Sequence, residues 1–211
     1  MDEIRTEDEQ VEALKKWWKE NGTTVIVAIA IALSVVGGYK YWQGQKMQQA
    51  WKASNEYKYV SEQLQGQSVD EGDIKRAEAL LADHQETVYA DFTSLQLAKI
   101  AVEKEDYDAA LAHLKTALVQ VQSKQLKPII NFRIAQVQFA KGELEAALAT
   151  LGGIQDKGQQ HLVKELQGDI HNAKGDTTNA LALYKESIAL LGEAATSNKT
   201  LQLKYKNLGG K

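Results

Sequence analysis

The chain has 211 residues, no cysteine and a formal net charge of −3. The lack of cysteine excludes disulfides, thiolate metal sites and thiol catalysis. Residues 43–211 carry twenty Lys and Arg against twenty-one Asp and Glu, so this part has no excess positive charge with which to bind nucleic acid.

The chain begins with a polar tail. Residues 1–20 contain four basic and seven acidic side chains. Within them Val11, Leu14 and Trp18 would share one face of a helix. We interpret residues 1–20 as an acidic tail that positions the next segment at a membrane surface.

The next segment is apolar. Residues 21–39 run for nineteen positions without a charge, and such a helix would be roughly 28 Å long, close to the roughly 30 Å hydrocarbon core of a bilayer. We therefore predict a transmembrane helix over residues 21–42. Amphipathic aromatic rings favour the headgroup level, and the predicted membrane-interface residues are Trp17, Trp18, Tyr39, Tyr41 and Trp42.

A cleaved signal peptide is the alternative to an anchor, because Ala-Leu-Ser at residues 32–34 resembles a small-residue cleavage site. A secretory n-region is short and basic, however, whereas the 20 residues before the apolar run are mostly acidic. The sequence therefore favours an anchor that stays in place.

Charge hardly distinguishes the two orientations of this anchor, because similar numbers of basic residues flank it on both sides. The grouping of Lys15, Lys16 and Lys19 favours a cytoplasmic N-terminus under the positive-inside rule.

A polar helix over residues 45–64 follows the anchor, and an internal repeat begins after it. Four segments align without gaps at offsets of 33, 37 and 33 residues: GDIKRAEA from Gly72, EDYDAALA from Glu105, GELEAALA from Gly142 and GDTTNALA from Gly175. A period in the thirties with helix-forming composition is typical of stacked helical hairpins. The sequence therefore predicts an all-α fold, with a helical-hairpin solenoid over residues 43–208.

The residue types at these offsets suit helical hairpins. Glycine, or Glu105 in its place, is expected in the tight turn, where φ is positive. A small residue then allows close helix approach, and a large side chain follows one turn later. The small residues are Ala77, Ala110, Ala147 and Ala180, and the large ones are Leu81, Leu114, Leu151 and Tyr184.

The repeats resemble tetratricopeptide repeats. The large-small pair of the first helix is present as Leu97-Ala98 and Ile134-Ala135, and weakly as Gln167-Gly168. The early tryptophan of that family is replaced by Ser94, Asn131 and Lys164. We therefore predict helix pairs at 91–104 with 107–122, 128–141 with 144–152, and 160–174 with 177–191, after a first pair made by the post-anchor helix and residues 73–83.

The C-terminal segment 199–208 permits two interpretations. It can cap the last repeat as a helix, or form a short strand because Leu201, Leu203 and Tyr205 alternate with polar residues.

We find no pattern for catalysis. The four histidines lack the i, i+4 spacing of a metalloprotease site, and the glycine pairs lack the spacing of a dinucleotide fingerprint or a phosphate loop. We predict a protein that is no enzyme and has no metal or cofactor, and whose function is binding.

In tetratricopeptide folds the first helix of each pair lines a concave groove. Aromatic side chains there can hold a hydrophobic peptide, or they can pack under the neighbouring repeat, and the sequence leaves both open. The predicted groove residues are Phe92, Leu95, Lys99, Val102, Ile129, Phe132, Gln136, Phe139, Leu162, Glu165, Asp169 and Asn172.

The whole chain resembles one bacterial family. The tail ends in EQVEALKKWWKENG, and one apolar helix, the sequence YKYW and the degenerate repeats follow. This arrangement is similar to the ancillary SecYEG translocon subunit family of the YfgM type. The resemblance implies a single-pass bacterial inner-membrane protein with a cytoplasmic N-terminus and a periplasmic repeat domain.

The resemblance also implies association with the SecYEG translocon and with a membrane-anchored chaperone of the PpiD type. We therefore expect a non-enzymatic translocon subunit whose repeats bind that chaperone or emerging, unfolded secretory chains, with the bilayer holding the anchor. The alternative is a membrane-anchored tetratricopeptide scaffold for another cell-envelope assembly.

Overall fold

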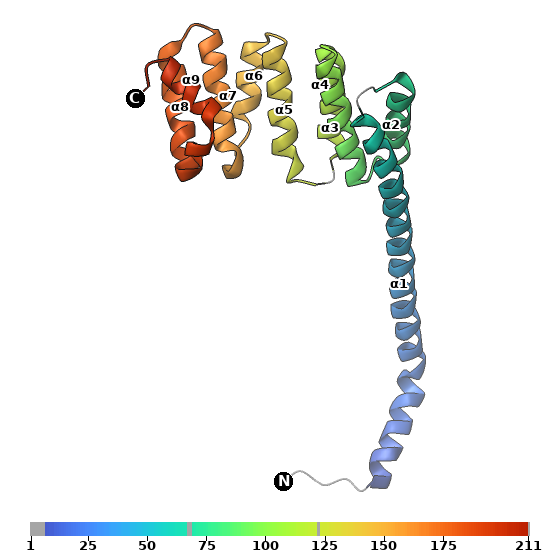
Figure 1. Cartoon of the computed structure of the whole chain (residues 1–211). Coiled ribbons are helices and arrows are strands. Elements are labelled where there is room, and N and C mark those ends of the chain that lie inside the picture. The colour runs from blue at the N-terminus through green and yellow to red at the C-terminus, as the bar shows by residue number, and fades with distance from the viewer. Residues whose placement is uncertain (1–6, 67–68, 122, 211) are drawn as a thin grey trace, which may run out of the picture. The chain divides into compact units, whose positions relative to one another are not determined.

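The computed structural model describes residues 7–66, 69–121 and 123–210, and within these ranges every regular element is a helix (Figure 1). The chain divides into two compact units, Met1–Trp51 and Lys52–Lys211. The α-helices are α1 (Glu7–Leu64), α2 (Glu71–Asp83), α3 (Val88–Glu103), α4 (Tyr107–Gln120), α5 (Leu126–Ala140), α6 (Leu144–Gly152), α7 (Gln160–Ala173), α8 (Thr177–Leu191) and α9 (Lys199–Asn207).

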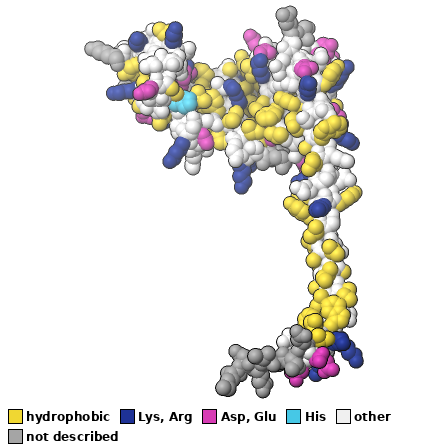
Figure 2. Space-filling view, turned by 60° about the horizontal axis from the view of Figure 1, so that its bottom comes forward, with side chains coloured by type: hydrophobic (Ala, Val, Ile, Leu, Met, Phe, Trp, Pro, Cys, Tyr) yellow, Lys and Arg dark blue, Asp and Glu magenta, His cyan; other side chains and the backbone are white. Residues whose placement is uncertain are grey.

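The first unit consists of the N-terminal part of α1, whose apolar side chains point outward. Ile26, Ile31 and Leu33 are each more than half exposed, and hydrophobic side chains cover this stretch (Figure 2). In the described residues α1 is the one helix long and apolar enough to cross a membrane. A helix that is apolar all round needs an apolar environment. The predicted single N-terminal transmembrane helix is confirmed, while its bounds at 21–42 stay a prediction because α1 continues without a break.

The predicted interface aromatics lie on the surface of α1. Trp17, Trp18 and Tyr41 are exposed. The rings of Tyr39 and Trp42 are 6.2 Å apart, and the Lys46 ammonium lies 4.4 Å from the centre of the Trp42 ring. A cation over an aromatic face suits the boundary between hydrocarbon and phosphate. Their role at the membrane surface stays a prediction.

Side-chain caps and positive-φ turns define the hairpins. Asp106 and Asp176 cap α4 and α8 by accepting backbone N–H groups. Immediately before them, the chain reverses at Glu105 and Gly175 with φ of 59° and 80°, as the repeat predicts. Gly72 differs, because Asp70 forms a capping box with Asp73 and starts α2 one residue before this glycine. The prediction that Gly72 lies in the turn is therefore wrong.

The small residues of the repeat lie where the paired helices meet. Ala77, Ala110, Ala147 and Ala180 are completely buried, as predicted. The predicted large side chains Leu114, Leu151 and Tyr184 are also buried, whereas Leu80 replaces the half-buried Leu81 in the first copy.

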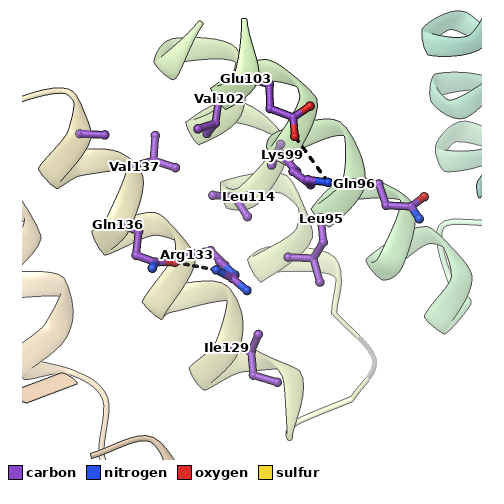
Figure 3. A pocket seen from close by; sticks show the side chains of 12 residues that line it. Leu95, Gln96, Lys99, Val102, Glu103, Leu114, Ile129, Arg133, Gln136 and Val137 are labelled. Carbon is purple, nitrogen blue, oxygen red and sulfur yellow. Dashed lines mark hydrogen bonds and ion pairs between the residues drawn. The ribbon is translucent and has the colours of Figure 1, made fainter. Parts of the chain in front are cut away.

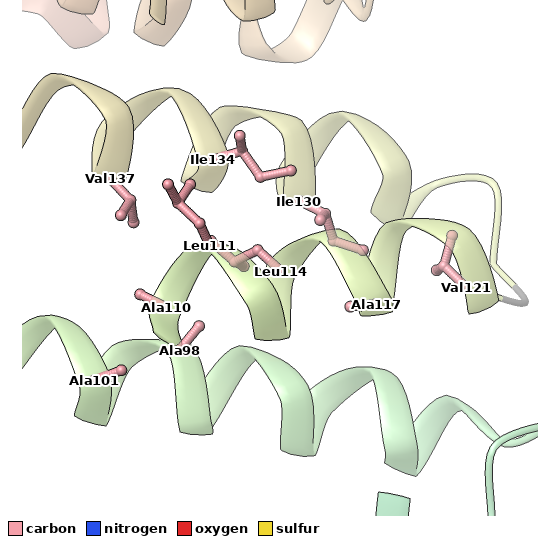
Figure 4. Close-up of a cluster of buried hydrophobic side chains, with 10 residues drawn as sticks. All are labelled: Ala98, Ala101, Ala110, Leu111, Leu114, Ala117, Val121, Ile130, Ile134 and Val137. Carbon is pink, nitrogen blue, oxygen red and sulfur yellow. The ribbon is translucent and has the colours of Figure 1, made fainter. Parts of the chain in front are cut away.

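The first helix of a hairpin packs on two sides. Helix α3 directs Leu97 and Ile100 towards α2 and the end of α1, and Ala98 and Ala101 towards α4. Helix α5 repeats this arrangement between α4 on one side and α6 and α7 on the other. Figure 4 shows the cluster that joins α3, α4 and α5. Neighbouring repeats therefore share their cores, and the stability of each depends on the next.

The C-terminal segment is the helix α9, and the strand alternative is wrong. The Asn198 side chain caps α9 by accepting the Leu201 N–H at 3.1 Å. Leu201, Tyr205 and Leu208 pack in one cluster with Tyr184, while Leu203 is 60% exposed. The buried residues follow the helical period, so the alternation seen in the sequence is incidental.

We predict that Gly168→Ala lowers the free energy of unfolding by about 1–3 kcal/mol, because added atoms strain a packed core. A Cβ at this position in α7 would lie 2.6 Å from the buried Tyr184 ring. The matched control is Gly152→Ala in α6, where a Cβ meets nothing within 4 Å. Urea unfolding of the full chain in detergent, followed by circular dichroism, compares the two. Equal stabilities would contradict the close approach of α7 and α8.

Candidate peptide-binding groove

A groove of about 630 Å³ lies between α3 and α5, with Leu114 of α4 among its lining residues (Figure 3). Its size falls within the roughly 300–1,000 Å³ typical of ligand pockets. We call it the α3–α5 groove. Its lining residues are Leu95, Gln96, Ala98, Lys99, Val102, Glu103, Leu114, Ile129, Arg133, Gln136, Val137 and Ala140.

The groove results from how α3 and α5 use the helix between them. Ala98 and Ala101 of α3 and Ile130 and Ile134 of α5 belong to one buried cluster around α4. Both helices therefore pack against α4 and lie beside each other over it. Small side chains such as Ala98 and Ala140 leave space between them.

The polar side chains of the groove pair within their own helices. Lys99 Nζ lies 3.4 Å from Glu103 Oε1 on α3, and Arg133 Nη1 donates to Gln136 Oε1 at 2.8 Å on α5. No hydrogen bond or ion pair between described residues joins the two walls, so a partner can enter without breaking one.

Five of the predicted groove residues line this groove: Leu95, Lys99, Val102, Ile129 and Gln136. Arg133 was not predicted, although it follows Ile129 by four residues and precedes Gln136 by three. A strict helical period places it on the same face, so the sequence did contain the signal.

The three phenylalanines do not line the groove. Phe132 is 8% exposed and belongs to the core shared with α6 and α7, and Phe139 packs against the same core. These two follow the alternative in which they pack under the neighbouring repeat. The Phe92 ring lies 6.1 Å from that of Tyr57 near the end of α1.

The inward positions of the last repeat are partly occupied by α9. Lys204 Nζ donates to Glu165 Oε1 at 2.8 Å and to Asp169 Oδ2 at 2.7 Å. The Tyr184 hydroxyl donates to the other oxygen of Asp169 at 2.8 Å. Leu162 and Asn172 stay exposed on α7, outside this network. The α3–α5 groove is therefore the part of the predicted surface where several predicted residues line one cavity.

The surroundings of Lys204 and Tyr184 raise the pKa of both side chains, so both stay protonated. Burial lowers the pKa of Lys204, but the hydrogen bonds to Asp169 and Glu165 outweigh this and leave the pKa raised. Burial is also the main cause that raises the pKa of Tyr184, and the hydrogen bond to Asp169 adds to it. At neutral pH Lys204 is charged and Tyr184 is a neutral donor.

We predict that Lys204→Met lowers the free energy of unfolding by about 1–3 kcal/mol, because two poorly exposed carboxylates lose their cation. Lys206→Met is the matched control on the exposed side of α9, with an expected change within about 0.5 kcal/mol. Urea unfolding of the full chain checks both. A similar loss of stability in both variants would contradict a stabilising role for the contacts of Lys204 with Glu165 and Asp169.

The groove offers a binding surface and has no obvious reactive group. Among the described residues, no group of three or more His, Cys, Asp and Glu is placed to hold a metal ion. His84 pairs with Glu56 at 2.9 Å and His171 with Asp176 at 3.0 Å, and none of these four residues lines the groove.

Comparison with known proteins agrees with the fold. The tetratricopeptide repeat-like domain family matches residues 15–210. The chain is thus a membrane-anchored protein of the tetratricopeptide-repeat-like class. No solved structure matches it.

Similarity to named proteins identifies one family within this class. The ancillary SecYEG translocon subunit of Haemophilus influenzae is 36% identical over 86% of this chain and 88% of its own. The protein of that name in Aggregatibacter actinomycetemcomitans is 32% identical over 96% and 97%. The one in Escherichia coli is 30% identical over 99% of both chains. The chain belongs to the family of ancillary SecYEG translocon subunits.

Proposed function

We propose that this chain is a non-enzymatic ancillary subunit of the Sec translocon. In this proposal α1 docks beside the protein-conducting channel, and the repeat domain binds a chaperone or emerging secretory chains at the channel exit. The observation that carries the proposal is the match to ancillary SecYEG translocon subunits over 99% of both chains in one relative. The match therefore extends over the anchor as well as the repeats.

The orientation that suits this function has a cytoplasmic N-terminus and a periplasmic repeat domain in the bacterial inner membrane. The grouped Lys15, Lys16 and Lys19 support it through the positive-inside rule. In this orientation the α3–α5 groove faces the compartment into which secretory chains emerge.

The groove supplies the binding surface in this proposal. Its apolar side chains, such as the partly buried Leu95 and the exposed Ile129, suit segments that are not yet folded or a chaperone of the PpiD type that carries an apolar segment. Each contact is small, but tethering at the membrane raises the local concentration and makes weak contacts effective.

Photo-crosslinking in living cells tests the proposal at two positions. A photoreactive residue at Ala30 in the anchor is expected to capture SecYEG subunits. A photoreactive residue at Ile129, which is 39% exposed at the groove, is expected to capture a membrane-anchored chaperone or secretory chains.

The matched control position is Val119 of α4, which is 86% exposed and lies outside the groove lining. It is expected to give far less of the same products. Capture of one unrelated envelope protein at Ile129, with no channel subunit at Ala30, would contradict the proposal and favour the scaffold for another cell-envelope assembly.

A further inference from the structure

The α3–α5 groove carries a positive charge that no carboxylate balances. Lys99 pairs with Glu103 on its own helix. Arg133 is exposed, and among the described contacts it donates to the Gln136 amide oxygen and pairs with no acidic residue. The lining therefore holds two cations and one carboxylate beside an apolar surface.

We infer that the groove prefers partner segments in which a few apolar side chains lie next to a carboxylate, and that Arg133 selects them. This rests on the proposed function, because it assumes that the groove binds polypeptide. The groove of about 630 Å³ has room for only a few side chains, so one charge beside them is a large part of what it can distinguish.

The chemistry of Arg133 suits this selection. One of its terminal nitrogens donates to Gln136, and the planar guanidinium has further N–H donors that match a carboxylate in a bidentate pair. Leu95 and Ile129 line the same groove, so they can contact the apolar side chains of a segment whose carboxylate pairs with Arg133. A basic segment would meet the net positive charge of this lining and bind less well.

The other end of the repeat domain does not reverse this preference. Glu165 and Asp169 could attract a basic segment, but Lys204 of α9 already binds both at 2.8 Å and 2.7 Å. A cation from a partner would have to displace Lys204. The open positive charge at Arg133 therefore sets the preference of the surface.

Peptide binding to the full-length protein in nanodiscs tests the inference. Three fluorescent peptides share the same apolar residues and differ at one adjacent position, which is Glu, Gln or Lys. Fluorescence anisotropy should give a dissociation constant about two- to fivefold lower for the Glu peptide than for the Gln peptide, as an exposed ion pair provides. The Lys peptide should bind most weakly, and added salt should remove the differences.

Arg133→Gln should make the Glu and Gln peptides bind equally, with the affinity for the Gln peptide unchanged. The matched control is Arg76→Gln in α2, an arginine that pairs with Asp73 at 3.6 Å and lies outside the groove lining. This control should keep the wild-type order of the three peptides.

The outcomes separate this inference from the proposed function. If the wild-type protein binds all three peptides equally, the charge selection is overturned and the groove remains a peptide site. A preference that survives Arg133→Gln would overturn the assignment to Arg133. If no peptide binds, both the inference and the role of the groove in the proposed function are overturned.

Discussion

Each first helix of the repeat domain has two apolar faces, and only neighbours on both sides can bury them. Helix α5 contributes Ile130 and Ile134 to the cluster around α4, and Phe132 and Ala135 to the next cluster. A single hairpin could not bury both faces, so the hairpins must stack. The groove follows from the same constraint, because α3 and α5 both pack on α4 and leave space between them.

The first and last hairpins of such a stack each lack one neighbour, so other segments must cover their apolar faces. At the C-terminus, α9 covers Tyr184 with Leu201 and holds the last repeat through Lys204. At the N-terminus, the end of α1 supplies Val60 and Leu64 to the first cluster with α2 and α3. The helix that carries the membrane anchor is therefore also part of the first repeat.

Much of the fold could be predicted from the sequence because the repeat fixes the register. The fully buried Ala110 and Ala147, and the positive φ of Glu105 and Gly142, follow directly from the aligned segments. Gly72 could not be placed this way, because a capping box between Asp70 and Asp73 competes with the repeat pattern. Locally, side-chain hydrogen bonds determined where α2 begins.

The candidate site was harder to predict, because the helical period shows which residues share a face of a helix but not which part of that face a neighbouring helix covers. Ile129 and Phe132 both suit an inward face, yet Ile129 lines the groove and Phe132 packs in the core. Lys204 and Asp169 are 35 residues apart in the sequence, and no local sequence pattern predicts their contact. Such contacts depend on tertiary packing.

In the proposed orientation, the anchor keeps the acidic tail and the groove on opposite sides of the inner membrane. The chain has no cysteine, so Asp8→Cys and Val119→Cys each introduce a unique thiol. In spheroplasts, a membrane-impermeant maleimide should label the Val119→Cys protein at once and the Asp8→Cys protein only after detergent is added. The reverse pattern, or recovery of either protein from the soluble fraction, would contradict the account.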